Sequence, residues 1–333
     1  MRVDLWSGAC FFSGRRASFG GRVGVVCLAC MKADGGNCSG AAKVHFHLPG
    51  LFEFDSFYEV FLPLFRERRE FFYPWCDIGS VYGAPADCLW GGGRCGFGEA
   101  DAEEALALVD AHGISPRLTF SNSLLRAEHL SDRKCNALCR TFSKASAGGG
   151  AIVHSDLLAR YLAEKYPDLY LVSSTTKVLT EFADFEAELR RDEFSFVVPD
   201  FRLNKSFGSL GALPRELKDK VEFLCNECCP VTCARRKACY ESVSRKNLGE
   251  RDDGHRCAGG EYKFSRAMRS PAFIGVGDIV GKYVPMGFSN FKIEGRGLGS
   301  AVLLEFILHY MTRPERQLEV REAVYLDSSL DLF

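Results

Sequence analysis

Eight short apolar runs alternate with longer amphipathic stretches between residues 43 and 312. The runs occupy 43–49, 75–83, 115–121, 150–156, 169–174, 194–200, 220–227 and 290–295. Strand-like runs that alternate with helical stretches indicate a parallel sheet with right-handed crossovers, and eight repeats favour closure of that sheet. We therefore predict an α/β fold of the (β/α)8 TIM-barrel type.

The same rhythm sets the domain organisation that we expect. Residues 1–40 are rich in Gly, Ser and Cys without a clear period, which predicts a flexible extension; Met31 is an alternative start to Met1. The barrel domain is predicted over 41–315, with 228–288 as a cysteine-containing excursion between strands seven and eight. Residues 316–333 are predicted to form a C-terminal tail. A barrel of ~250 residues plus extensions fits this length.

Charge and motifs exclude several classes of protein. The 42 basic and 43 acidic residues leave no global excess that would indicate a nucleic-acid or membrane partner. No GxGxxG follows the first run, and GxxxxGK(S/T) is absent from the sequence, so neither a Rossmann nor a P-loop nucleotide site is indicated. No apolar run approaches the ~20 residues of a membrane span.

Fifteen cysteines are many for a chain of this size. The apolar stretch at 21–30 is short and broken by glycine, and it lacks a clear cleavage site, so a signal peptide is not favoured. The odd number of cysteines also fits a disulfide framework poorly. We predict a cytoplasmic protein, in which clustered cysteines indicate metal binding or catalysis.

Polar residues follow seven of the eight runs, where the active sites of parallel barrels lie. From them we predict a pocket formed by Asn122, Asp156, Thr175, Glu294 and Arg296. An arginine such as Arg296 offers a two-pronged donor to carboxylate ligands. Asp156 and Thr175 are equally suited to capping the helices that follow them. Glu294 and Arg296 could instead form an ion pair that closes the barrel.

The densest signal is the cysteine-rich segment FLCNECCPVTCARRKAC at 223–239. Its cysteines are Cys225, Cys228, Cys229, Cys233 and Cys239, and Cys257 follows on the same excursion. Zinc often takes paired CxxC ligands, but Cys225 and Cys228 form one such pair and no second pair follows. An iron–sulfur cluster tolerates irregular spacing and is the metal centre that we predict, with zinc as the alternative. Cys135 and Cys139, four apart on a helix, are explained by packing.

Three segments resemble the peptidase U32 family of collagenase-like proteins, as a divergent branch. They are NFKIEGR at 290–296, the stretch 148–176 and LTFSNSLL at 118–125, and the similarity runs over 43–312. The resemblance implies a barrel-like fold. Some members of the family are proteases, and others catalyse oxygen-independent hydroxylation of transfer RNA, ribosomal RNA or the ubiquinone ring, several with a 4Fe–4S cluster.

The resemblance also implies a set of cluster ligands. Cys229 and Cys233 look like a CxxxC pair of the family, and Cys88 resembles a remote cysteine ligand. Cys257 is predicted as the fourth ligand, with Cys225 and Cys239 as alternates. The sequence PREL comes later than in typical members, at 214–217, so no member's substrate can be transferred to this chain.

Three functions remain open from the sequence. The first is a redox enzyme of the hydroxylase type, acting on RNA or on a small aromatic or quinone substrate. The second is a U32-type peptidase, although the sequence contains no HExxH and no recognised nucleophile motif. The third is a non-catalytic metal-binding subunit with a protein partner, or an RNA-binding module that uses the basic segment at 235–251. An enzyme is the expectation.

Overall fold

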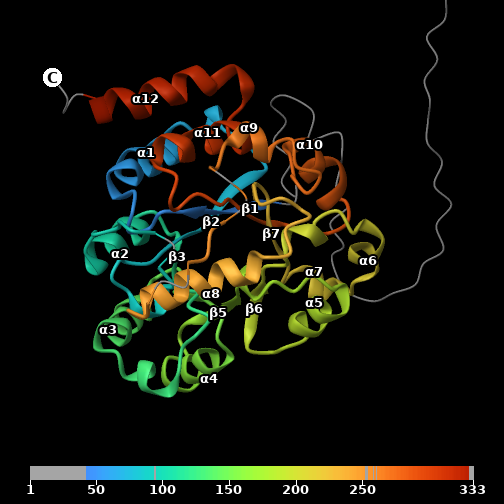
Figure 1. Cartoon of the computed structure of the whole chain (residues 1–333). Coiled ribbons are helices and arrows are strands. Elements are labelled where there is room, and N and C mark those ends of the chain that lie inside the picture. The colour runs from blue at the N-terminus through green and yellow to red at the C-terminus, as the bar shows by residue number, and fades with distance from the viewer. Residues whose placement is uncertain (1–42, 94, 252–253, 258, 260, 330–333) are drawn as a thin grey trace, which may run out of the picture. The chain divides into compact units, whose positions relative to one another are not determined.

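A computed structural model describes residues 43–329, except 94, 252–253, 258 and 260, and the side chains of 326–329. The predicted extension 1–40, with Met31, lies outside the described residues. The described strands form one parallel sheet in the order β6-β5-β4-β3-β2-β1-β8-β7 (Figure 1). They are β1 (Val44–Pro49), β2 (Cys76–Gly83), β3 (Ser115–Phe120), β4 (Gly150–Val153), β5 (Tyr170–Ser173), β6 (Phe194–Val197), β7 (Glu222–Leu224) and β8 (Asn290–Lys292).

The two ends of this sheet meet and close the barrel. Val197 of β6 forms a parallel bridge with Val221, which directly precedes β7. The Val197 amide donates to the carbonyl of Lys220 at 2.8 Å. This one bridge between the two edge strands leaves the barrel nearly closed. The strand order and the bridge confirm the predicted TIM-type (β/α)8 fold.

Helices follow the strands as the sequence pattern predicts. The helices between β1 and β7 are α1 (Asp55–Glu67), α2 (Ala102–Asp110), α3 (Arg133–Phe142), α4 (Asp156–Lys165), α5 (Phe182–Leu189), α6 (Phe207–Ala212) and α7 (Arg215–Lys218). Three of them begin where a side chain accepts from the first free N–H groups: Asp101 at α2, Asp132 at α3 and Ser155 at α4. Gly113 follows α2 with φ +65°, the left-handed conformation in which glycine commonly ends a helix.

Alternate residues of each strand face opposite sides of the barrel wall. Phe46 of β1 packs on Phe291 of β8 and on Tyr310 of the outer helix α11 (Ser300–Tyr310). Their neighbours in sequence, His47 and Lys292, are paired in register and face the barrel interior. The period of two in a strand thus separates an apolar outer layer from a polar interior.

The excursion between β7 and β8 forms a partly helical cover. It contains α8 (Arg236–Asn247), α9 (Phe264–Ala267), α10 (Val276–Asp278) and a π-helical turn, Ile279–Tyr283. Figure 1 shows α8 crossing in front of the strands. At its C-terminal end, the Asn247 amide donates to the carbonyl of Leu89 at 2.7 Å. The excursion therefore lies across the barrel mouth.

The segment predicted as a tail contains a helix, α12 (Gln317–Ser329). Val320 and Val324 of this helix are buried, and α12 packs against α1. Among the described residues, no helix is long and apolar enough to span a membrane.

Candidate functional site

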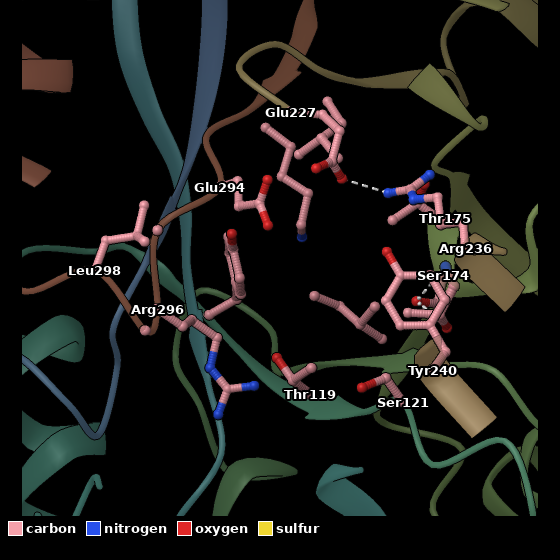
Figure 2. A pocket seen from close by; sticks show the side chains of 17 residues that line it. Thr119, Ser121, Ser174, Thr175, Glu227, Arg236, Tyr240, Glu294, Arg296 and Leu298 are labelled. Carbon is pink, nitrogen blue, oxygen red and sulfur yellow. Dashed lines mark hydrogen bonds and ion pairs between the residues drawn. The ribbon is translucent and has the colours of Figure 1, made fainter. Parts of the chain in front are cut away.

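A cavity of about 310 Å³ opens at the carboxyl ends of the strands (Figure 2). Its wall comes from β2, β3, β4, β7 and β8, from the loops after β3, β5, β7 and β8, and from α8 of the excursion. This is the end of a parallel barrel where chemistry is expected. Of the five predicted pocket residues, Thr175, Glu294 and Arg296 line this cavity.

β8 and the loop after it supply three charged residues at every second position. Lys292, Glu294 and Arg296 all line the cavity, because alternate residues of an extended chain share a face. Arg296 donates through Nε to Glu53 Oε1 at 2.6 Å and through a terminal nitrogen to the carbonyl of Ala84 at 2.9 Å. Arg296 thus forms an ion pair with Glu53, in the segment between β1 and α1.

The side-chain amide of Asn226 holds the chain beside Glu294. Its oxygen accepts from the Glu294 amide at 2.7 Å, and its nitrogen donates to the Glu294 carbonyl at 3.1 Å. The ends of β7 and β8 are therefore fixed to each other where the Glu294 carboxylate enters the cavity.

Helix α8 supplies a buried arginine to the opposite wall. Arg236 pairs with Asp200 at 2.7 Å and with Glu227 at 2.5 Å, and Figure 2 shows the second contact. Asp200 also accepts from Arg202 at 2.6 Å. Removal of one partner from a buried ion pair of this kind strongly destabilises the fold. Arg236 therefore anchors α8 to the strand ends, and it is not available to the RNA surface predicted at 235–251.

A network of charged side chains fills the barrel below the cavity. Arg117 of β3 pairs with Glu222 of β7. Lys292 Nζ lies 3.3 Å from the other oxygen of Glu222, and His47 Nε2 lies 3.4 Å from the same carboxylate. Arg117 also donates to Tyr170 at 2.7 Å. The Glu222 carboxylate therefore contacts two cationic side chains and an imidazole in the buried interior of the barrel.

This crowding shifts the ionisation of the network. Burial, reinforced by Arg117 and opposed by Glu222, lowers the pKa of His47 to about 3. Burial, opposed by Glu222 and reinforced by Arg117, lowers the pKa of Lys292 to about 8. Burial alone would raise the pKa of Glu222, but the neighbouring cations outweigh it and lower that pKa. His47 is thus neutral at pH 7, and Lys292 gives up its proton at a lower pH than an ordinary lysine does.

Hydroxyl groups line another part of the cavity. Thr175 donates to the carbonyl of Pro199 at 3.0 Å, and Thr176 lies 2.9 Å from His154 Nδ1. Burial lowers the pKa of His154 to about 4. The buried hydroxyl of Thr119 has no hydrogen-bond partner within the described part of the chain. Figure 2 shows Thr119 among the residues that surround the cavity.

The other two predicted pocket residues do not line the cavity. Asn122 is buried in the wall, where it donates to the carbonyl of Leu89 at 3.2 Å and accepts from the amide of Leu124 at 2.9 Å. Asp156 begins α4 and is half exposed. It pairs with Lys177 at 2.8 Å and with Arg191 at 2.9 Å.

Two of the predicted or alternate cysteine ligands lie in the barrel wall. The sulfur of Cys88 is 3.5 Å from that of Cys135 on α3, and both residues are buried. Burial and the charge of Cys88 raise the pKa of Cys139, one turn along the same helix. Cys225 is fully buried and donates to the carbonyl of Phe223. These thiols pack as small apolar groups.

Four cysteines on the excursion form two pairs, Cys229 with Cys233 and Cys239 with Cys257. Burial raises the pKa of Cys229 to about 12, and a hydrogen bond with Cys233 adds to this shift. Burial also raises the pKa of Cys239, and its neighbours Cys257 and Cys233 contribute. The Cys239 sulfur lies 3.0 Å from His255 Nε2. Among the described residues, no three Cys, His, Asp or Glu side chains are arranged to hold a metal ion as they stand.

Several site residues were not predicted from the sequence. They are Tyr82, Arg117, Glu222, Lys292, Arg236 and Tyr240. A signal was present, because Arg117, Glu222 and Lys292 are charged residues in short strands whose residues are all buried. A charged residue at such a position requires a partner inside the barrel. The two α8 residues had no comparable signal.

These features define a nearly closed (β/α)8 barrel with a charged cavity at its mouth and a cysteine-bearing cover. The chain is similar in structure to the U32 peptidase Mk0906, with a TM-score of 0.48 and 13% sequence identity over 80% of this chain and 97% of that chain. The barrel assignment rests on the strand pairing. No family model and no curated protein matches the chain by sequence.

Proposed function

We propose that the protein is a redox enzyme whose active site is the barrel-mouth cavity and whose metal centre is an iron–sulfur cluster on the excursion. One observation carries this proposal: helix α8 contributes residues both to the cavity wall and to the cysteine pairs. Its residues Arg236 and Tyr240 line the cavity, and Cys239 between them lies next to Cys233 and Cys257. A centre held by these cysteines would be one helix away from a bound substrate.

The donor set fits a cluster by its chemistry. Four thiols from Cys229, Cys233, Cys239 and Cys257 form two neighbouring pairs on one cover segment. Iron–sulfur clusters take four cysteine thiolates. The thiols are not arranged around a common centre as they stand, so side chains must turn on binding. Binding would also displace the thiol protons, since only the thiolate is a ligand.

This set differs from the predicted one, because it omits Cys88 and includes Cys239, which the sequence offered as an alternate to Cys257. The Cys88 thiol contacts Cys135 inside the wall between β2 and α3, whereas Cys239 faces the excursion. The ligand set that includes Cys88 stays a prediction, and separate variants of the two cysteines distinguish the sets.

The chain's own residues have defined tasks in this proposal. Lys292, Glu294 and Thr119 face the cavity and would bind and orient a small polar substrate. Asp200 and Glu227 hold Arg236 and so keep α8 closed over it. A bound cluster would supply or accept single electrons. The choice between RNA and a quinone ring stays a prediction, as do a peptidase activity and a partner subunit.

The test is the metal content of protein purified without oxygen. We expect broad visible absorbance and about four irons per chain, because each cluster of this type holds four. Cys233→Ser and Cys239→Ser should each lose most of the iron. One zinc per chain without colour would overturn the assignment of the metal.

A matched control comes from the buried thiols. Cys135→Ser and Cys88→Ser should keep the iron of the unmodified protein, because both side chains pack inside the wall. Loss of iron in Cys88→Ser, with the fold retained by circular dichroism, would restore Cys88 to the ligand set.

A further inference from the structure

The lysine at the base of the cavity is in an unusual position. Lys292 is 6% exposed, yet it lines the cavity. Its ammonium nitrogen lies 3.6 Å from the centre of the Tyr82 ring and 3.3 Å from Glu222. The amine is therefore held by packing against the Tyr82 ring and by its contact with the Glu222 carboxylate.

Burial favours the neutral form of this lysine, and the charges around it act in both directions, because Glu222 raises the pKa and Arg117 lowers it. Glu222 is shared with Arg117, whose guanidinium keeps its proton at all ordinary pH values. His47 is neutral, so it does not add a third positive charge beside the Glu222 carboxylate. Two cations thus compete for one anion in a medium of low dielectric, and the lysine is the one that can yield its proton. Arg296, beyond Lys292 on the same strand path, acts in the same direction.

The cavity beside this amine has room and polar groups for a small oxygen-containing molecule. Its volume is about 310 Å³. Thr119 is 8% exposed and lines the same space, and its buried hydroxyl has no hydrogen-bond partner among the described residues. Glu294 supplies a carboxylate at the same wall.

We infer that Lys292 is a nucleophile that binds a small, oxygen-rich aldehyde or ketone covalently as an imine. The inference rests on the cavity being a substrate site, as in the proposed function, and does not depend on the cluster. Such lysines are activated by desolvation and by neighbouring cations.

The step is balanced without an oxidant or reductant. The lone pair of the Lys292 amine forms a bond to the carbonyl carbon, and the oxygen takes a proton to give a carbinolamine. The C–O bond then breaks, water leaves with a second proton, and an iminium ion remains. The sum is one carbonyl compound and one lysine ammonium giving one iminium and one water. Glu294 is the group that we assign to carry the proton between the two stages.

Reductive trapping tests this inference. The full chain is incubated with dihydroxyacetone or pyruvate and sodium cyanoborohydride, and the modified lysine is found by peptide mass spectrometry. At pH 7.5 the neutral fraction of a lysine with a pKa near 8 is about a hundredfold or more that of one at the ordinary value of 10.5. We expect Lys292 to be labelled first, with a rate that levels off above pH 8.

Labelling of the unmodified protein is by itself enough to test the inference. No adduct on Lys292 with either probe, or a labelling rate that still rises tenfold per pH unit up to pH 10, would overturn the inference. Lys292→Arg should remove the fast adduct, whereas Lys282→Arg, at an exposed lysine, should leave it.

The same experiment on Cys233→Ser separates the two proposals. Labelling of Lys292 in this variant should match the unmodified protein even where iron is lost. If Cys233→Ser loses iron but Lys292 is still labelled, the result concerns the cluster alone. If the unmodified protein contains iron but Lys292 is not labelled, the lysine inference alone is overturned.

Discussion

At the scale of single residues, the main finding is a charged interior where a TIM barrel usually packs apolar side chains. Glu222 is fully buried and contacts Arg117, Lys292 and His47. The arrangement is stable only while each buried charge has a partner of opposite sign, since an unpaired buried charge is costly. His47 in particular must stay neutral.

This requirement predicts a loss of stability in acid. The pKa of His47 is about 3 in the fold and 6.5 for an ordinary histidine, so the unfolded chain binds more protons between these values. Stability therefore falls as the pH falls from about 6.5 towards about 3, by up to about 1.4 kcal/mol per pH unit from this group. Denaturant unfolding at a series of pH values measures the slope.

His47→Gln should reduce that slope by close to one proton, because glutamine does not titrate. His129→Gln, at a partly exposed histidine outside the network, serves as the control and should leave the slope as it is. Equal slopes for the unmodified protein and His47→Gln would contradict the account.

At the scale of elements, α8 connects the cysteine pairs to the cavity. Its N-terminal end is fixed by Arg236 between Asp200 and Glu227, and its C-terminal end by Asn247 against Leu89. The sequence predicted that an excursion would stand at 228–288 but not that it contains a helix over the mouth. The pattern of α8 is weak, because buried Ser242 and Ser244 take the places of apolar residues.

Removing the anchor should release this cover. Arg236→Met leaves Asp200 and Glu227 without their shared cation, and breaking a buried pair costs about 3–5 kcal/mol. Hydrogen exchange followed by mass spectrometry should show faster exchange in 228–250 and unchanged exchange in β1–β4. Lys237→Met, at the exposed neighbouring residue, is the matched control. Uniformly faster exchange throughout the barrel would contradict a local role.

At the scale of the whole molecule, the sequence predicted the barrel well because its signal is periodic. Each predicted strand overlaps an observed one, for example 115–121 with Ser115–Phe120 and 290–295 with Asn290–Lys292. The site was predicted less completely. Thr175, Glu294 and Arg296 were found from strand ends, whereas Arg236 and Tyr240 reach the cavity from a helix whose position depends on tertiary contacts.

The weak pairing between β6 and β7 predicts that the barrel opens first at this seam. β6 and β7 are joined by the single bridge Val197–Val221, whereas β1 and β2 pair over six residues. We expect the Val197 amide, bonded to Lys220, to exchange faster than amides of β1–β4 in native-state hydrogen exchange. Equal protection around the barrel would show that the seam is as stable as the rest.

The central claim is that the excursion holds an iron–sulfur cluster beside the barrel-mouth cavity. The most direct measurement is anomalous diffraction at the iron absorption edge from crystals grown without oxygen. The account predicts one strong peak bounded by Cys229, Cys233, Cys239 and Cys257, close to α8. A fully iron-free map, or a peak beside Cys88 and Cys135 instead, would contradict it.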